Sequence, residues 1–102
     1  MKEIAVTDLA ARVKQGTATI VDVREPDEWQ SEHVEGAVHI PMSQFMEREG
    51  ELPDADELHI MCHSGGRSAR VAQYLEQKGI DAVNVDGGIV AWQQAGLPVV
   101  SG

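Results

Sequence analysis

Short apolar runs alternate with segments of helical character along this 102-residue chain. The runs are predicted to be β-strands because they are rich in aliphatic and β-branched residues with little polar alternation, a pattern typical of strands covered on both faces. The segments between them have the apolar spacing, first-turn acids or terminal glycines of helices. Strands that alternate with helices predict an α/β fold in which one parallel sheet carries helices on both faces.

About five strands are expected, in the ranges 3–6, 18–23, 37–41, 58–62 and 81–85. A first helix is predicted to follow Thr7 as its N-cap and to end at Gly16. Further helices are predicted in the ranges 26–32, 43–49, 68–79 and 89–96. A chain of this length is expected to form a single domain that covers residues 1–102.

The charge balance narrows the classes of partner. Eight Lys and Arg residues face seventeen Asp and Glu residues, so the formal net charge is -9. This charge repels nucleic acids and anionic membrane surfaces, neither of which is an expected partner. A lone cysteine cannot form an internal disulfide, and the chain shows neither a signal peptide core nor a membrane span. A cytoplasmic location is therefore expected.

The stretch "CHSGGRS" (62–68) places the only cysteine at the end of an expected strand and directly before an expected helix. In open parallel sheets, ligands bind beyond the carboxyl ends of the strands, where loops lead into helices. Cys62 therefore occupies a candidate site position. Asp22 and Arg24 end another strand, and they are expected at the same edge, as organisers of the strand end or as the rim of a pocket.

Two glycines and a helix start favour ionisation of this cysteine. Gly65 and Gly66 are expected to adopt positive φ and to turn backbone N–H groups toward the sulfur. A helix that begins near Arg67 adds unpaired N–H groups and the positive end of its dipole. Such surroundings lower a cysteine pKa into a range of about 3.5–7.5. Cys62 is therefore predicted to be largely thiolate at neutral pH.

A buried small hydrophobe that merely precedes a turn is the simplest alternative for a lone cysteine. The spacing to the arginine favours chemistry instead, because four residues separate Cys62 from Arg67 with two glycines among them. Cysteine phosphatases place five residues in the corresponding loop. The shorter loop forms a tighter ring, which suits a thiolate carrying one extra sulfur better than a tetrahedral phosphoryl group.

The same stretch resembles the active-site loop of single-domain rhodaneses, which are sulfurtransferases. The segment 21–41 is similar to the N-terminal signature of this family, with its Asp-x-Arg, its acidic-aromatic pair and its closing Ile-Pro. The segment 86–99 is similar to the C-terminal signature, with Gly87, Gly88 and Trp92 in register. The three segments occur in the order expected for the family and span most of the chain.

The resemblance implies transfer of a sulfane sulfur through a persulfide on Cys62, without a cofactor. It implies a small-molecule donor, thiosulfate or a persulfide, and a thiol or cyanide acceptor; a protein could also serve as donor or acceptor. Backbone N–H groups of residues 63–67 would hold the negative charge of the persulfide. The implied substrate-binding residues are His63, Ser64, Gly65, Gly66, Arg67 and Ser68.

The chain departs from the family pattern at two positions. His63 stands where the family often has arginine, which weakens the case for thiosulfate and favours a persulfide or a protein as donor. Glu32 replaces a glycine before the signature histidine, which puts a strained turn at this position in doubt but not the active-site loop.

Two other functions stay open. One is a rhodanese-like interaction, regulatory or protein-to-protein persulfide relay module with little turnover on small molecules. The other is a cysteine phosphatase or arsenate reductase. The spacing of the four histidines does not predict a metal site.

Overall fold

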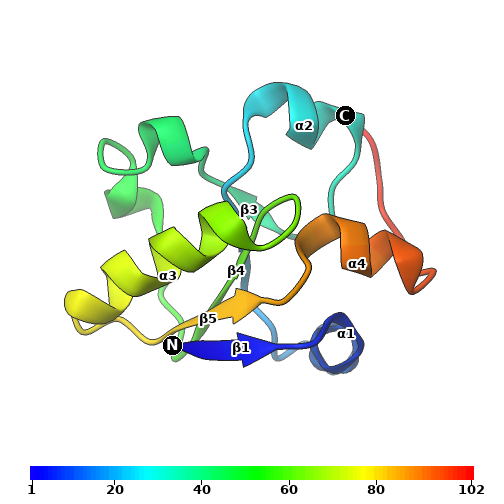
Figure 1. Cartoon of the computed structure of the whole chain (residues 1–102), viewed down its shortest axis with the longest axis horizontal. Helices are drawn as coiled ribbons and strands as arrows, with labels where there is room; N and C mark the ends of the chain where they lie inside the picture. Colours follow the sequence, from blue (N-terminus) through cyan, green and yellow to red (C-terminus); the bar gives the residue numbers. More distant parts are fainter.

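A computed structural model describes residues 1–102 and contains one sheet of parallel strands in the order β1-β5-β4-β2-β3 (Figure 1). The strands, in chain order, are β1 (Lys2–Ile4), β2 (Ile20–Asp22), β3 (Val38–His39), β4 (Leu58–Met61) and β5 (Ala82–Val85). The predicted α/β class, with one parallel sheet of five strands, is confirmed.

The helices are α1 (Val6–Lys14), α2 (Pro26–Ser31), α3 (Gly66–Gln77) and α4 (Gly88–Gln94). Two predictions about helices are wrong. Thr7 is not the N-cap of α1, because Ala5 holds that position and the helix begins at Val6, which is buried in the core. The range 43–49 forms no α-helix; two single 3-10 turns, η1 (Met42–Gln44) and η2 (Glu49–Glu51), replace it. Of residues 43–49, only Phe45 is buried, so little packing supports a longer helix there.

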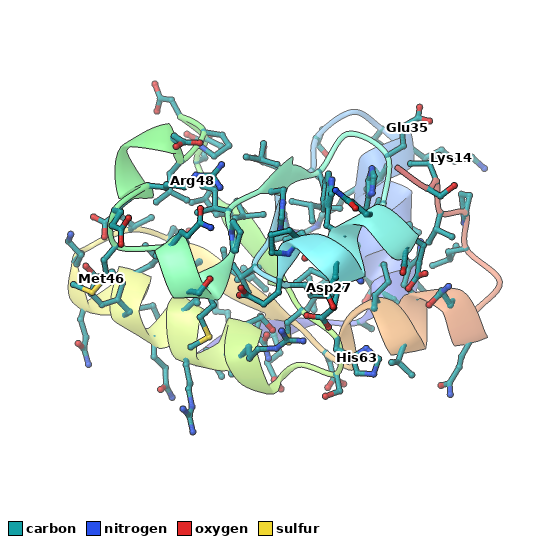
Figure 2. All side chains as sticks on the ribbon, turned by 90° about the horizontal axis from the view of Figure 1, so that it is seen from above. Lys14, Asp27, Glu35, Met46, Arg48 and His63 are labelled. Carbon is teal, nitrogen blue, oxygen red and sulfur yellow. The ribbon has the colours of Figure 1, made fainter.

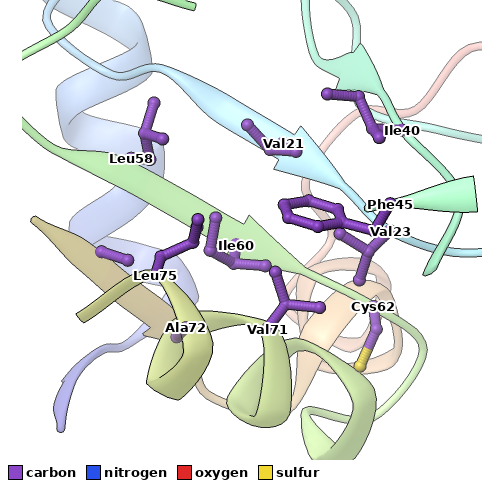
Figure 3. Packing of buried hydrophobic residues seen from close by; sticks show 11 residues of the cluster. Val21, Val23, Ile40, Phe45, Leu58, Ile60, Cys62, Val71, Ala72 and Leu75 are labelled. Carbon is purple, nitrogen blue, oxygen red and sulfur yellow. The ribbon is translucent and has the colours of Figure 1, made fainter. Parts of the chain in front are cut away.

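Neighbouring residues of each strand belong to opposite faces of the sheet. Val21 and Ile60 pack with Leu75 of α3 in one buried cluster, which is drawn in Figure 3. Ile20 and Met61, one position away on the same strands, belong to a second cluster. This second cluster also holds buried residues of α1 and α4, so these two helices cover the other face (Figure 1).

The carboxyl ends of three adjacent strands meet at one edge of the sheet. Asp22 ends β2 and is the register partner of Met61, after which Cys62 follows directly. Asp86 follows β5 on the other side of β4. The predicted common edge for Cys62 and Asp22 is therefore observed. None of the helices is long and apolar enough to cross a membrane.

Candidate active site

Cys62 is buried between the end of β4 and the start of α3, with 1% of its surface exposed. Figure 3 shows its sulfur turned away from the aliphatic side chains and toward the loop before α3. Its backbone is held by hydrogen bonds from α4. The first amides of α4 donate to the loop, Ile89 N to the Cys62 carbonyl at 2.9 Å and Val90 N to the His63 carbonyl at 3.1 Å. The start of the loop is thereby fixed.

Gly65 turns the loop back over the sulfur. Its φ of +108° lies in the region that only glycine adopts readily, and its N–H donates to Cys62 Sγ at 3.1 Å. Gly66 does not share this geometry: it is the first residue of α3 and has no positive φ, so the prediction for Gly66 is wrong. One glycine makes the turn, and the other begins the helix.

Ser68 brings a hydroxyl group to the same sulfur. Its side chain is fully buried in the first turn of α3, and its Oγ lies 3.2 Å from Cys62 Sγ. The same Oγ lies 2.5 Å from Oδ1 of Asn84 on β5. Asn84 is buried beneath the loop, and nothing in the sequence pattern of its strand singled it out as a site residue.

Two opposing effects act on the thiol. Burial raises the pKa of Cys62, whereas hydrogen bonds from the Ser68 hydroxyl and from the backbone N–H groups of Ser68, Gly65 and Ser64 lower it. The net result is a pKa for Cys62 below the ordinary value of a thiol. Hydrogen bonds from the loop and the start of α3 thus favour the thiolate over the thiol, as expected for a reactive cysteine.

Arg67, in the first turn of α3, is bound to α2. Its Nη1 and Nη2 donate to the two carboxylate oxygens of Glu28 at 2.7 and 2.8 Å, a bidentate ion pair. This guanidinium holds the pKa of Glu28 at about 2. The positive charge of Arg67, which interacts with Cys62, is therefore already matched by a carboxylate.

Glu28 is itself held in place by the helix on which it lies. It is the N3 residue of α2, and its Oε1 accepts the Glu25 N–H at 3.1 Å, one half of a capping box. From the sequence, Glu28 is predicted only as one of the acids at the start of a helix and as part of the family signature. Its capping position is a local pattern, whereas its contact with Arg67 joins residues 39 positions apart and has no such pattern.

Asp22 and Arg24 form a buried ion pair, at 0% and 1% exposure. Arg24 Nη2 lies 2.8 Å from Asp22 Oδ2, and its remaining donors reach backbone carbonyls of α2 and of the residue after it. The pair therefore joins the end of β2 to α2, which carries Glu28. Both side chains are buried, so neither exposes its charge to solvent at this edge of the sheet.

Glu32, where the family has glycine, causes no strained turn. Its φ of -165° is extended backbone that any residue adopts. Its carbonyl accepts a hydrogen bond from Arg24 Nη2 at 2.7 Å. The substitution leaves the backbone path intact at this position.

His63 and Ser64 form the outer part of the loop. Both are exposed, and neither side chain makes a hydrogen bond within the chain. Figure 2 shows His63 at the surface between the starts of α3 and α4. These two side chains are free to meet a ligand that approaches the loop from outside, whereas Ser68 and the Gly65 amide act from within.

Trp29, which follows Glu28 on α2, is held between two imidazole rings. The His33 ring stacks on the indole at a centroid distance of 3.7 Å, and the His39 ring stacks on it at 4.6 Å. His39 Nε2 also lies 2.7 Å from the Arg24 carbonyl. The stack links α2 to β3 and to the strand end that holds the buried ion pair.

Gly88 lets α4 approach the loop. A Cβ at this position would lie 2.4 Å from the Cys62 carbonyl oxygen and 2.6 Å from the His63 carbonyl oxygen. No other residue type allows this contact without a shift, since a real Cβ essentially never comes so close. The glycine pair was noted in the C-terminal signature, but its close approach to the cysteine loop becomes visible only in three dimensions.

The family model for the rhodanese-like domain matches residues 5–95, which include every residue of this site. The chain belongs to the rhodanese-like domain family. Thiosulfate sulfurtransferase GlpE from Vibrio cholerae is 39% identical over 94% of this chain and 92% of its own length. YtwF from Bacillus subtilis, named as a candidate sulfurtransferase, is 35% identical over 91% of each chain.

Other rhodanese relatives are longer than this chain. YrkF from Bacillus subtilis, named as a candidate sulfur carrier protein, is 42% identical over 72% of this chain but only 40% of its own length. Thus the chain spans less than half of YrkF. Among solved structures, a rhodanese-related protein from Thermoplasma volcanium has a TM-score of 0.91, with 34% identity and 98% of each chain covered. This neighbour has the same fold over nearly its whole length.

Proposed function

We propose that this rhodanese-like protein is a sulfurtransferase that carries a sulfane sulfur as a persulfide on Cys62. The observation that supports this most directly is the surrounding of Sγ: a Gly65 N–H at 3.1 Å, the Ser68 hydroxyl at 3.2 Å and a lowered thiol pKa. An ionised sulfur in a preorganised ring of donors is the starting point for nucleophilic catalysis.

Transfer proceeds in two displacements at sulfur. The Cys62 thiolate attacks the outer sulfur of the donor; the S–S bond of the donor breaks, and the leaving group departs with the bonding electron pair, as sulfite from thiosulfate or as thiolate from a persulfide. An acceptor thiolate or cyanide then attacks the outer sulfur of the Cys62 persulfide, and the Cys62 thiolate leaves. No net oxidation occurs, and no cofactor is needed.

The roles of the other residues follow from their positions. The N–H groups of Gly65 and its neighbours would bind the charge of the persulfide, while Ser64 and His63 would meet the rest of the donor at the loop surface. Arg67 would act mainly as the anchor of the loop, since Glu28 takes both outer nitrogens of its guanidinium. Asp22 and Arg24 would position α2.

The engaged state of Arg67 favours persulfides over thiosulfate as donors. Thiosulfate is a dianion, the chain carries a formal charge of -9, and His63 supplies no fixed positive charge beside the nucleophile. A persulfide of a small thiol or of a protein brings less negative charge to the loop. This supports a second candidate, a protein-to-protein persulfide relay, which the similarity to the named sulfur carrier YrkF also favours.

Intact mass spectrometry tests the proposal. Reduced protein is incubated with thiosulfate, or with a low-molecular-weight persulfide, and then freed of excess donor, with Cys62→Ser as the matched control. A gain of one sulfur atom in the wild type alone is expected, faster from the persulfide. If neither donor loads Cys62, the small-molecule sulfurtransferase is excluded. Rapid phosphate release from an aryl phosphate would instead support the phosphatase alternative.

A further inference from the structure

A line of hydrogen bonds runs from Cys62 across the sheet to its edge strand. Ser68 Oγ lies between Cys62 Sγ and Oδ1 of Asn84, at 3.2 and 2.5 Å. The Asn84 amide continues the line, because its Nδ2 donates to Oε2 of Glu3 at 3.1 Å. Asn84 on β5 is the direct register partner of Glu3 on β1. The line thus connects a buried nucleophile with an exposed carboxylate.

Glu3 determines which way the Asn84 amide faces. A carboxylate only accepts hydrogen bonds, so it pairs with the NH2 group and leaves Oδ1 toward Ser68. Two oxygens 2.5 Å apart require a proton between them, and the amide oxygen carries none. The single hydroxyl proton of Ser68 has three acceptors within reach, and the shortest contact, to Asn84 Oδ1, draws it away from Cys62 Sγ at 3.2 Å and from the Gly65 carbonyl at 3.3 Å.

The geometry points to Glu3 and Asn84 as positioning residues that weaken the hydrogen bond from the Ser68 hydroxyl to the resting Cys62 sulfur. The thiolate then relies chiefly on the backbone N–H groups of the loop, and the hydroxyl turns fully to the sulfur only when the amide of Asn84 releases it. Because a hydrogen bond to the charged form favours that form, release of the hydroxyl lowers the thiol pKa further. The importance of this control for catalysis rests on the proposed sulfurtransferase function, whereas the ionisation of Cys62 does not.

Other charged groups around Cys62 act without this connection. Arg67 of α3 is paired with Glu28 of α2, and the Asp22–Arg24 pair is closed within the interior beyond β2. His63 is exposed in the loop, and α4 carries no charged residue. Asp86, just after β5, is an exposed carboxylate with no side-chain hydrogen bond, so it offers a charge near the loop that lies outside the chain of hydrogen bonds.

The test is the pH dependence of Cys62 alkylation by iodoacetamide, which follows the thiolate fraction. In Glu3→Gln the amide at position 3 can accept as well as donate, so the Asn84 amide can turn, present its NH2 group to Ser68 and free the hydroxyl for the sulfur. We expect the apparent pKa of Cys62 to fall by about 0.5–1 unit, the scale of one hydrogen bond to a charged group shared between two acceptors. Asn84→Ala, which removes the competing acceptor, is expected to shift it in the same direction.

A double-mutant cycle separates this path from a through-space effect of charge. In a Ser68→Ala background, Glu3→Gln is expected to leave the apparent pKa unchanged, because no hydroxyl remains to be released. Asp86→Ser removes a nearby negative charge and is expected to give a smaller shift than Glu3→Gln. Thermal unfolding checks the fold of each variant; Glu3 is exposed, so its variant remains decisive even if Asn84→Ala does not fold.

The proposal is overturned if Glu3→Gln leaves the apparent pKa of Cys62 unchanged or raises it. It is also overturned if Glu3→Gln shifts the pKa equally with and without the Ser68 hydroxyl, or if Asp86→Ser shifts the pKa of Cys62 as much as Glu3→Gln does. Alkylation requires no sulfur donor, so these results are independent of whether Cys62 carries a persulfide.

Discussion

Both carboxylate oxygens of Glu28 are bound by Arg67, although the two residues lie on different helices. The side chains are 28% and 34% exposed, so the pair is at the boundary between interior and solvent. The pair joins the start of α3, next to the Cys62 loop, to α2, and it offsets the positive charge of Arg67. The first effect stabilises the loop, and the second would, under the proposed function, restrict which donors the loop attracts.

Neutralising Glu28 should improve the use of an anionic donor. In Glu28→Gln, the amide oxygen still accepts from Arg67, but the guanidinium charge is no longer matched. We expect kcat/KM for thiosulfate to rise about five-fold, the scale of one partly exposed charge interaction. Steady-state kinetics at low salt measure it, with Glu51→Gln, which removes a carboxylate from the Arg48 pair in η2, as the control. A fall in kcat/KM would show that anchoring of the loop outweighs charge.

The acid stability of the protein should depend on the same carboxylate. The pKa of Glu28 is lowered from an ordinary 4.5 to about 2 in the folded protein, first by its hydrogen bonds with Arg67. A lowered folded pKa gives stability that is present above the unfolded value and is lost as pH falls from about 4.5 toward 2. We expect Glu28→Gln to show a shallower loss of Tm in this window. Parallel Tm curves for the two proteins would contradict the prediction.

The buried ion pair at the end of β2 should be costly to break on one side. Arg24→Met leaves the Asp22 carboxylate buried without its partner and is expected to reduce the free energy of unfolding by about 3–5 kcal/mol. Asp22→Leu combined with Arg24→Met removes both charges and should recover a large part of that loss, as urea unfolding would show. If the double variant is no more stable than Arg24→Met, the bonds from Arg24 to the α2 carbonyls carry the stability.

Crowding at Gly88 should make that position intolerant of a side chain. Gly88→Ala forces a Cβ against the Cys62 and His63 carbonyls and imposes a φ of +56° on alanine. We expect a loss of stability of more than about 1–3 kcal/mol, the cost of left-handed backbone alone, and slower sulfur loading of Cys62. Gly36→Ala is the matched control, since it has a φ of +88° and open space around its Cβ. Equal losses in the two variants would mean that the close approach matters little.

Much of the fold is predictable from the sequence because its signals are local. The aliphatic runs around Val21, Ile60 and Val83 identify three neighbouring strands of the sheet, and the spacing of Val71, Ala72 and Leu75 gives the buried face of α3. The position of Cys62 at a strand end follows from the same pattern. The segment 43–49 was mispredicted because helical propensity there is not supported by packing.

The partners of the site residues were not predictable in the same way. In the sequence, Asn84 is simply one residue of a buried strand. Its contact with Ser68 depends on the position of β5 beneath the Cys62 loop, which the sequence does not show. The sequence identifies Glu28 only as an acid that caps a helix, and its contact with Arg67 becomes visible only when the position of α2 is known. In both cases the decisive contact joins distant parts of the chain, for which a single sequence carries no periodic signal.

The indole of Trp29, stacked between His33 and His39, gives α2 an optical signature. An imidazole ring stacked on an indole changes its fluorescence, so the emission of Trp29 depends on whether this stack is intact. Trp92 is buried in the second core cluster, on the other face of the sheet. A displacement of α2 that carried Glu28 away from Arg67 would separate the Trp29 indole from His39 on β3 and change its emission, so the protein contains its own fluorescent reporter of whether the cysteine loop is anchored.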